Sequence, residues 1–245
     1  MEVLAIKPID LDRAYVPLDL VFEKDAAEHP AGHSDSDIFE VNKSDPRLER
    51  DNKPVDIAAA CKKWSRLGIV GDAGCGKSAL LQWVGLATAK YLRWQKLSPE
   101  QHKLIRSIKL YHLRILVPVL IPLREYHSYC KEYKLPHEPG TLWQFLEGYA
   151  TRKYPALKLP ADFFTWLMHR GCLLMLDGVD EVDERIRPAV RDAVEGLICL
   201  PGNHKRNRYL VTTRPSAANI PAQLPGFHQS FVLPLAHQKR ERLLR

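Results

Sequence analysis

The chain lacks the features that mark membrane proteins and disulfide-stabilised proteins. Its longest apolar run, ILVPVLIPL at 115–123, is far too short to span a bilayer. The first ten residues, MEVLAIKPID, include two acids and no long apolar stretch, which excludes a signal peptide. The five cysteines are odd in number and contain no CxxC pair, which disfavours a zinc site or a disulfide framework. We therefore expect a cytoplasmic protein with reduced thiols and no membrane partner.

The chain is instead typical of a soluble globular protein with an uneven charge distribution. Hydrophobic residues make up 45% and charged residues 27%, and 245 residues suffice for one large α/β domain with extensions. Residues 1–60 hold 14 acids and 7 Lys/Arg, whereas the remainder holds 15 acids and 29 Lys/Arg. Such a basic body can attract nucleic acid or other anionic ligands, or it can contact the acidic lead-in. Charge alone does not favour nucleic acid, because solvated basic faces are common.

Strand-like and helix-like segments alternate from residue 55 onward. Apolar runs predict strands at 66–71, 115–123, 171–177, 208–214 and 230–235. Helices are predicted at 55–64, 78–94, 141–154, 162–170 and 184–200. This alternation predicts an α/β fold with a parallel five-stranded sheet sandwiched by helices. Pro118 and Pro122 remove ladder donors, so the strand at 115–123 should lie at or near a sheet edge. Residues 14–22 can form one short extended segment, and residues 22–54 form a loop or linker.

The turn GDAGCGKSAL after the first predicted strand fits the pattern G-x-x-x-x-G-K-[ST]. Glycines allow successive backbone N–H groups to point at phosphate oxygens, and the following helix adds partial positive charge. Lys77 supplies a full charge for the terminal phosphates, and Ser78 suits Mg²⁺. Cys75 is either a small filler or a thiol whose alkylation blocks nucleotide binding. We expect the nucleotide to contact Gly71, Asp72, Ala73, Gly74, Cys75, Gly76, Lys77, Ser78 and Ala79.

The stretch LLMLDGVDEV ends a strand-like run in three acids. Asp177 stands at the end of the predicted buried strand, where it can hold Mg²⁺ together with Ser78. Asp180 and Glu181 follow within four residues, and acids this close repel one another unless a cation or solvent accounts for them. An alternative makes acids of this turn, Asp180 and Glu181 together or an aspartate at Asp180 or Asp183, the cap of the following helix.

Four motifs together resemble NACHT-type nucleotide-binding domains, within the STAND class of P-loop ATPases. They are GDAGCGKSAL, VPVLIPLREY, LLMLDGVDEV and LVTTRPSA, spread over about 55–235. The most discriminating feature is Gly178, because most related ATPases carry a glutamate directly after the magnesium aspartate. The resemblance implies that the LVTT strand lies between the other two motif strands. It also implies that Arg214 reads the γ-phosphate, although a surface ion pair is the alternative for this residue.

The resemblance also assigns the catalytic residues. Lys77 and Arg214 would neutralise phosphate charge, and Asp180 or Glu181 would orient the attacking water. By its place in the family motif Asp180 is the first choice and Glu181 the second.

The function implied by the resemblance is that of an ATP-driven conformational switch in signalling or defence. The ligands would be ATP or ADP with Mg²⁺, hydrolysis would be slow, and the domain would associate with itself or with a partner protein. We expect residues 1–54 to form an acidic lead-in and linker, residues 55–235 the nucleotide-binding domain, and residues 236–245 the start of a truncated helical extension.

Two alternatives remain open from the sequence. One is a nucleotide-binding scaffold without turnover. The other is an ATPase stimulated by nucleic acid, since cations and aromatic residues interleave at helical spacing. Those residues are Lys90, Arg93, Lys103, Arg106 and Lys109, with Tyr91, Trp94 and Tyr111. A solvated helix face whose aromatic residues pack inward accounts for the same pattern.

Overall fold

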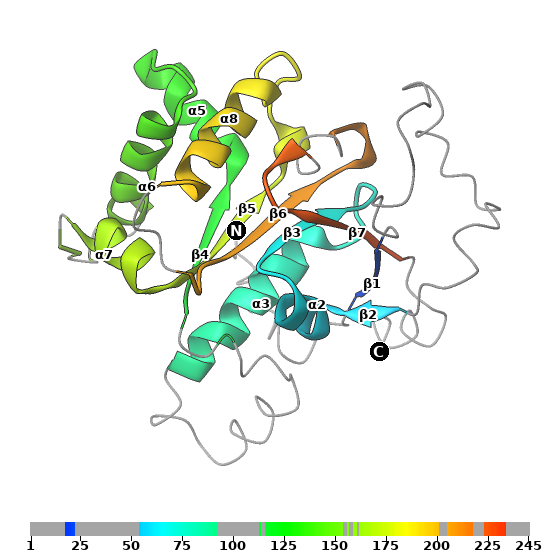
Figure 1. The fold of residues 1–245 in the computed structure, drawn as a ribbon. Helices are drawn as coiled ribbons and strands as arrows, with labels where there is room; N and C mark the ends of the chain where they lie inside the picture. Colours follow the sequence, from blue (N-terminus) through cyan, green and yellow to red (C-terminus); the bar gives the residue numbers. More distant parts are fainter. Residues whose placement is uncertain are drawn as a thin grey trace, which may run out of the picture.

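The computed structural model describes residues 18–22, 54–92, 113, 116–153, 156, 159–160, 162–200, 205–217 and 223–233. Within these residues, seven strands form one sheet in the order β2-β1-β7-β3-β6-β5-β4 (Figure 1). The strands are β1 (Asp19–Phe22), β2 (Val55–Asp56), β3 (Arg66–Val70), β4 (Val117–Pro122), β5 (Cys172–Asp177), β6 (Arg208–Thr213) and β7 (His228–Val232). The helices are α2 (Ile57–Lys63), α3 (Lys77–Leu92), α5 (Leu123–Tyr133), α6 (Pro139–Lys153), α7 (Phe163–Arg170) and α8 (Arg187–Ile198).

The predicted α/β class and the five parallel strands are confirmed. Strands β7, β3, β6, β5 and β4 pair in parallel, each with its neighbour. Strand β6 lies between β3 and β5, as the resemblance implied. Strand β4, which contains Pro118 and Pro122, lies at the end of the sheet, so the edge position inferred from its prolines is also confirmed.

The prediction of a purely parallel five-stranded sheet is wrong, because two antiparallel strands extend it beyond β7. Strand β1 pairs with β7, with Leu20 opposite Val232, and β2 pairs with β1, with Val55 opposite Leu20. Strand β1 confirms the extended segment predicted within residues 14–22, but Leu18, Leu20 and Val21 are buried in the domain core rather than in a separate lead-in. A two-residue strand such as β2 shows no periodicity, so the sequence pattern could not reveal it.

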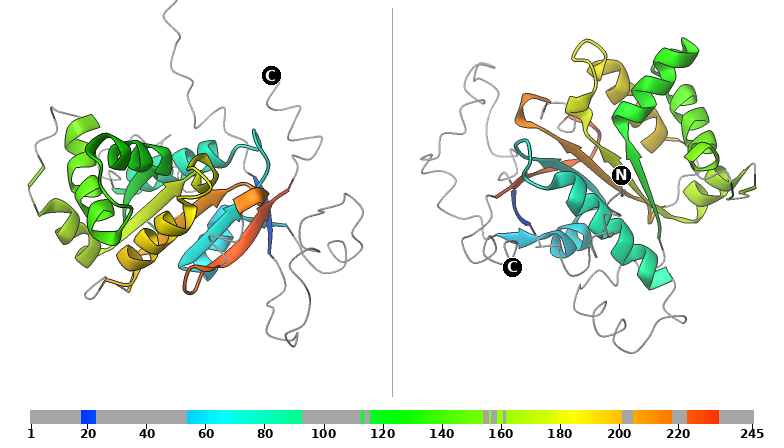
Figure 2. Two further views of the ribbon diagram at one scale, coloured as in Figure 1. Left: turned by 90° about the horizontal axis from the view of Figure 1, so that it is seen from above. Right: turned by 180° about the vertical axis from the view of Figure 1, so that it is seen from behind.

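Helices cover both faces of the sheet, as predicted. Side chains of β5 alternate between two hydrophobic clusters: Leu173 and Met175 pack with α2 and α3, whereas Leu174 and Leu176 pack with the helices from α5 to α8. Helix α3 lies in front of the sheet in the view from behind (Figure 2, right). Helix α8 lies on the opposite face, which is the near face in Figure 1. Because helices cover both faces of the sheet, β3, β5 and β6 are almost continuously buried.

The predicted helices are all present with boundaries shifted by a few residues, and one further helix, α5, is found. Helix α2 begins at Ile57 because Asp56 caps it, its Oδ1 accepting a hydrogen bond from the Ala59 amide at 2.7 Å. Helix α5 was not predicted, because it follows β4 directly with no intervening turn residues. It ends at Tyr133 and is capped by Lys134, which adopts a left-handed conformation with φ of 53°.

Several sequence-based predictions lie outside the described residues. They concern residues 93–112, which include most of the proposed cationic helix face, residues 236–245, and the lead-in apart from residues 18–22. In the part of the chain that the structure describes, each helix is too short or too polar to cross a membrane.

A buried asparagine joins three segments at the amino ends of the parallel strands. Asn207 is 3% exposed, and its Oδ1 accepts a hydrogen bond from the Cys172 amide at 2.9 Å. Its Nδ2 donates to the Met168 carbonyl at 3.0 Å and to the Tyr209 hydroxyl at 3.3 Å. The Tyr209 amide in turn donates to the Ser65 carbonyl at 2.9 Å. These bonds hold the starts of β3, β5 and β6 in a fixed arrangement.

We predict that Asn207→Ala lowers the free energy of unfolding by about 2–4 kcal/mol, because it leaves the buried Cys172 amide and Met168 carbonyl without partners. Tyr209→Phe, which removes only the 3.3 Å bond, should lower it by about 1 kcal/mol or less. Chemical denaturation measures both changes. Equal stability losses in the two variants would show that Asn207 is not the joining residue.

Candidate functional site

The glycine-rich turn connects the carboxyl end of β3 to the start of α3. Gly74 and Gly76 have φ of 73° and 94°, a conformation that other residues rarely adopt. A Cβ on Gly71 would lie 2.7 Å from the Cys75 Sγ, so the close curl of the turn also requires glycine there. The Cys75 amide closes the turn with a 3.3 Å bond to the Asp72 carbonyl. The predicted phosphate-loop residues thus form one compact turn.

Helix α3 begins at Lys77 and directs its first amides toward this turn. The Leu80 amide bonds to the Gly76 carbonyl at 2.8 Å, so helical bonding begins at the last glycine. The amides of Lys77, Ser78 and Ala79 belong to the first turn of the helix and have no helical acceptor. Together with the helix dipole they create partial positive charge where an anion would be held. The exposed Ser78 places its hydroxyl at the same helix end.

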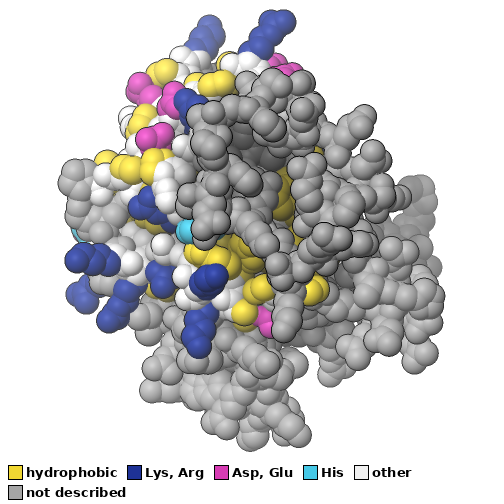
Figure 3. All heavy atoms as spheres, turned by 45° about the vertical axis from the view of Figure 1, so that its right-hand side comes forward, with side chains coloured by type: hydrophobic (Ala, Val, Ile, Leu, Met, Phe, Trp, Pro, Cys, Tyr) yellow, Lys and Arg dark blue, Asp and Glu magenta, His cyan; other side chains and the backbone are white. Residues whose placement is uncertain are grey.

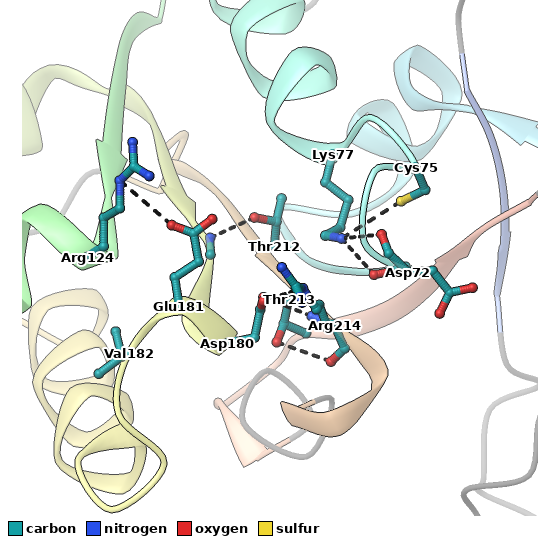
Figure 4. A network of polar contacts seen from close by, with 12 residues as sticks. Asp72, Cys75, Lys77, Arg124, Asp180, Glu181, Val182, Thr212, Thr213 and Arg214 are labelled. Atoms are coloured by element: carbon teal, nitrogen blue, oxygen red, sulfur yellow. Dashed lines mark hydrogen bonds and ion pairs between the residues drawn. The ribbon is translucent and has the colours of Figure 1, made fainter.

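The Lys77 side chain lies over the loop rather than in solvent. Its Nζ donates to the carbonyl oxygens of Gly71 at 2.6 Å and Asp72 at 2.9 Å, and lies 3.8 Å from the Cys75 Sγ (Figure 4). Among the described residues, no carboxylate forms an ion pair with this ammonium group. The positive charge is therefore positioned at the loop and is not neutralised by an acid.

Asp177 is held at the end of β5 by a threonine that sequence analysis did not single out. The Thr212 hydroxyl donates to the Asp177 Oδ1 at 2.5 Å and accepts from the Gly178 amide at 2.9 Å. Thr212 is fully buried, and its bond from the Gly178 amide is buried, whereas its bond to Asp177 is partly buried. The Gly71 amide bonds to the Thr213 carbonyl at 3.1 Å on the other side of β6. Asp177 and the loop thus flank β6, roughly 10 Å apart at the spacing of neighbouring strands.

Asp180 and Arg214 form an ion pair beside this edge. The Asp180 Oδ1 accepts a hydrogen bond from the Arg214 amide at 3.0 Å, and its Oδ2 lies 2.8 Å from the Arg214 Nε. The Asp180 side chain is only 7% exposed, whereas that of Arg214 is 51% exposed. Arg187 donates to the carbonyls of Asp180 and Val182 at 3.0 and 3.1 Å, which connects this turn to α8. The carboxylate of Asp180 is thus occupied by Arg214 on both oxygens.

Glu181 folds back over Gly178. Gly178 has φ of 77°, and a Cβ on it would lie 2.9 Å from the Glu181 Cδ. The space left by the glycine is therefore filled by the Glu181 side chain, which is 38% exposed. Its Oε2 lies 3.7 Å from the Nε of Arg124, at the start of α5 (Figure 4). The Glu181 carboxylate thus lies beside Gly178, the residue that directly follows Asp177, although the residue at that position itself has no side chain.

The helix-capping alternative for Asp180 and Glu181 is wrong. Helix α8 begins at Arg187 with no side-chain cap, and both acids lie in the short 3₁₀ turn Val179–Glu181. Asp183 makes the local turn contact instead, because its Oδ1 accepts from the Arg185 amide at 3.0 Å. Arg214 forms an ion pair with Asp180 in this structure, as the alternative interpretation of this residue expected. It lies at the carboxyl edge of the sheet, where the sequence placed it.

The predicted residues of the loop, of the DGVDE turn and of the TTRP motif all lie at the carboxyl ends of β3, β5 and β6. The sequence analysis missed Thr212, Arg124 and Arg187. Both Thr212 and Arg124 stood inside quoted motifs, LVTTRPSA and VPVLIPLREY, and a hydroxyl residue at the end of an apolar strand was the available signal for Thr212. No single-sequence signal pointed to Arg187.

Cys61, Cys130 and Cys172 are buried, Cys75 is half-buried and Cys199 is exposed. All five are free, and burial raises the pKa of the Cys61 and Cys172 thiols to about 12, so these remain protonated. Cys75 is half-buried and lies beside Lys77. Both interpretations of this residue therefore remain open: a small filler of the loop, or a thiol whose alkylation blocks nucleotide binding.

No protein-family model matches the chain, and no curated protein matches it. The geometry of the site and the motif resemblance therefore carry the functional argument.

We predict that Thr212→Val raises the Mg²⁺ concentration needed for nucleotide binding by about tenfold, because the valine cannot hold the Asp177 carboxylate in place. Thr212→Ser keeps the hydroxyl and should behave like the unmodified chain. Titration of Mg²⁺ against binding of a fluorescent ATP analogue measures both variants. If the valine and serine variants require the same Mg²⁺ concentration, Thr212 does not position Asp177.

Proposed function

We propose that the chain is an ATP-binding NTPase domain of the NACHT type that acts as a nucleotide-dependent switch in signalling or defence. The single observation that carries the proposal is the pairing of two features across β6. One is a tight glycine turn that opens α3 and holds an ammonium group. The other is Asp177, which is fixed by the buried Thr212. Phosphate and its metal ion require these two features side by side.

The described residues fit a nucleotide and Mg²⁺ by their chemistry. First-turn amides of α3 and the Lys77 ammonium suit phosphate oxygens. Ser78 and Asp177 offer the hard oxygen ligands that Mg²⁺ prefers, with phosphates and water completing its coordination. When bound, Mg²⁺ would neutralise negative charge that develops on the phosphates.

The contacts of the two later acids support a different order of preference from the sequence motif. Both Asp180 oxygens interact with Arg214 and the side chain is nearly buried, so it is poorly suited to orient water. Glu181 is half-exposed and lies against Gly178, directly beside the proposed magnesium residue. We therefore assign the water-orienting role to Glu181, and we assign to Asp180 the positioning of Arg214.

The Asp180–Arg214 pair supports a switching role. A γ-phosphate would compete with Asp180 for the Arg214 guanidinium, whereas ADP would leave the pair intact. A ligand shifts a conformational equilibrium only by its different affinity for the two states, and this competition provides such a difference. Arg187 contacts the backbone of Asp180, so a shift of the 3₁₀ turn would reach α8.

The alternative of a nucleotide-binding scaffold differs from the proposed function only in that it does not hydrolyse ATP. A measurement of single-turnover hydrolysis distinguishes the two. Of the cationic stripe proposed for a nucleic-acid-stimulated ATPase, only Lys90 and the backbone of Tyr91 lie within the described residues. Self-association or binding to a partner protein remains part of the proposal through the motif resemblance, and a cytoplasmic location remains part of it through the cysteine pattern.

The first test concerns nucleotide binding. A ligand at one hundred times its dissociation constant stabilises a fold by about 2.7 kcal/mol, so Mg-ATP should raise the melting temperature of the unmodified chain. Lys77→Ala removes the charge positioned at the loop and should abolish the shift. Lys62→Ala, which removes an exposed lysine on α2, is the control and should keep it. An equal shift in the Lys77→Ala and Lys62→Ala variants would refute the phosphate-loop assignment.

The second test separates the roles of the two acids. Glu181→Gln should slow single-turnover hydrolysis by about tenfold or more and leave Mg-ATP affinity within a few-fold of the unmodified chain. Asp180→Asn should instead raise the preference for ATP over ADP, because it weakens the competitor for Arg214. Arg214→Ala should weaken ATP binding more than ADP binding.

The control for the second test is the double variant. In an Arg214→Ala background, Asp180→Asn should no longer change the ATP-to-ADP preference. The assignment fails if Asp180→Asn slows hydrolysis while Glu181→Gln does not, or if the double variant still shows the shift in preference.

A further inference from the structure

A basic patch lies at the amino ends of the parallel strands, opposite the proposed nucleotide site. Its residues come from the end of α2 and start of β3, from the end of α7, and from the start of β6 and the residues before it. They are Lys62, Lys63, Arg66, Arg170, Lys205, Arg206 and Arg208. Figure 3 shows Lys and Arg side chains gathered at the lower left of the described surface, whereas the acidic side chains lie mainly at its top.

The fold holds these segments together. Asn207 bonds to the Cys172 amide and the Met168 carbonyl, and so joins the residues before β6 to the end of α7. The bond from the Tyr209 amide to the Ser65 carbonyl joins them to the start of β3. The basic patch is therefore built from rigid backbone segments, which limits the entropy lost when a ligand binds.

The two half-buried arginines of the patch contact backbone carbonyls. The Arg66 Nη1 donates to the Pro225 carbonyl at 2.5 Å. The Arg208 Nη1 donates to the carbonyls of Arg206 and Asn207, each at 3.3 Å, while its buried Nε has no hydrogen-bond partner among the described residues. Carbonyls orient these guanidinium groups without neutralising them.

Six of the seven patch cations form no ion pair with an acid among the described residues. The ion pairs of the described residues join carboxylates to Arg124, Lys153, Arg191 and Arg214. Within the same residues, none of the patch cations Lys62, Lys63, Arg66, Arg170, Lys205 and Arg208 forms such a pair. Like charges at this density repel one another, and a polyanion would relieve the repulsion.

An exposed indole borders the patch. Trp166 is 47% exposed and lies one helical turn before Arg170, whose guanidinium carbon is 6.0 Å from the ring. Phe163 stacks near this ring with centroids 6.0 Å apart, which steadies the indole. Trp64, inside the patch, has Lys63 4.3 Å from its ring but packs between Phe22 and His228. Trp166 is thus the ring available for stacking.

We propose that the basic patch and Trp166 bind single-stranded nucleic acid. Surfaces that bind single strands without sequence preference combine cations along the backbone with exposed aromatic rings for the bases. Planar guanidinium groups match phosphate oxygens, and an exposed indole beside them matches an unpaired base better than an acidic peptide. Arg66 and Gly71 lie at opposite ends of β3. A nucleic acid single strand at the patch and a nucleotide at the glycine turn could therefore be bound at the same time.

The test measures anisotropy of a labelled oligothymidine and a labelled oligouridine of about 16 nucleotides, at about 50 and about 200 mM salt. Both should bind the unmodified chain, more weakly at the higher salt. The double variant Lys62→Glu/Lys205→Glu changes exposed residues only, and should bind at least about tenfold more weakly. Its salt slope should fall by about 0.7 for each lost phosphate contact. Trp166→Ala should weaken binding about fivefold and leave the salt slope unchanged.

The matched control is Lys131→Glu/Lys134→Glu, which makes the same charge change at the exposed end of α5. Like Lys62, Lys131 lies in the last turn of its helix, so the two double variants carry a similar helix-dipole penalty. This control and Lys77→Ala should both bind oligonucleotide like the unmodified chain, which separates the patch from the nucleotide site. Circular dichroism verifies that each variant is folded.

Polyglutamate, duplex DNA and vesicles of anionic phospholipid serve as competitors. Each should displace the single strand poorly. The proposal is overturned if any of them binds the patch more tightly than the single strand. It is also overturned if the two double variants lose affinity equally, or if the unmodified chain binds no oligonucleotide at the lower salt.

Discussion

Thr212 connects the ends of two neighbouring strands through a single hydroxyl, which donates to Asp177 and accepts from the Gly178 amide. Since β6 also bonds to Gly71 on its other side, this strand is the common reference for the loop and the acid. A buried hydroxyl that both donates and accepts leaves neither strand end free to shift alone. The positions of Lys77, Asp177 and the DGVDE turn all follow from this connection and from the parallel register of β3, β6 and β5.

Gly178 shows how one small residue changes the roles of those around it. Its left-handed conformation turns the chain sharply after Asp177, and its missing side chain makes room for Glu181. The turn also brings Asp180 against the TTRP segment, where it meets the backbone and the side chain of Arg214. Two adjacent acids thereby have different surroundings, one half-exposed and one nearly buried, which sequence position alone does not distinguish.

The sequence predicted what depends on local pattern and could not predict what depends on long-range contact. The phosphate loop, α3, and the strands β3 to β7 carry periodicity or turn residues within a few positions of each other. Strand β2 does not, and residues 14–22 indicated an extended segment but not its place in the sheet, because β1 and β2 are fixed only by pairing with β7 and with each other. The Asp180–Arg214 and Thr212–Asp177 contacts join residues 34 and 35 positions apart, so no local pattern encodes them. For Asp180 the family motif therefore indicated that it orients the attacking water, whereas its long-range contacts favour the positioning of Arg214.

Strand β1 has a practical consequence for any shorter version of this domain. It pairs with β7 over Leu20, Val21 and Phe22, and its buried side chains fill the core beneath α2. A chain begun at residue 55, where the sequence pattern places the domain boundary, would leave β7 with one row of unpaired N–H and C=O groups. Such a row is a template for pairing with strands of other molecules, and it favours aggregation or strand exchange. The solubility of the domain in isolation thus depends on a four-residue segment that lies more than thirty residues before the rest of its sheet.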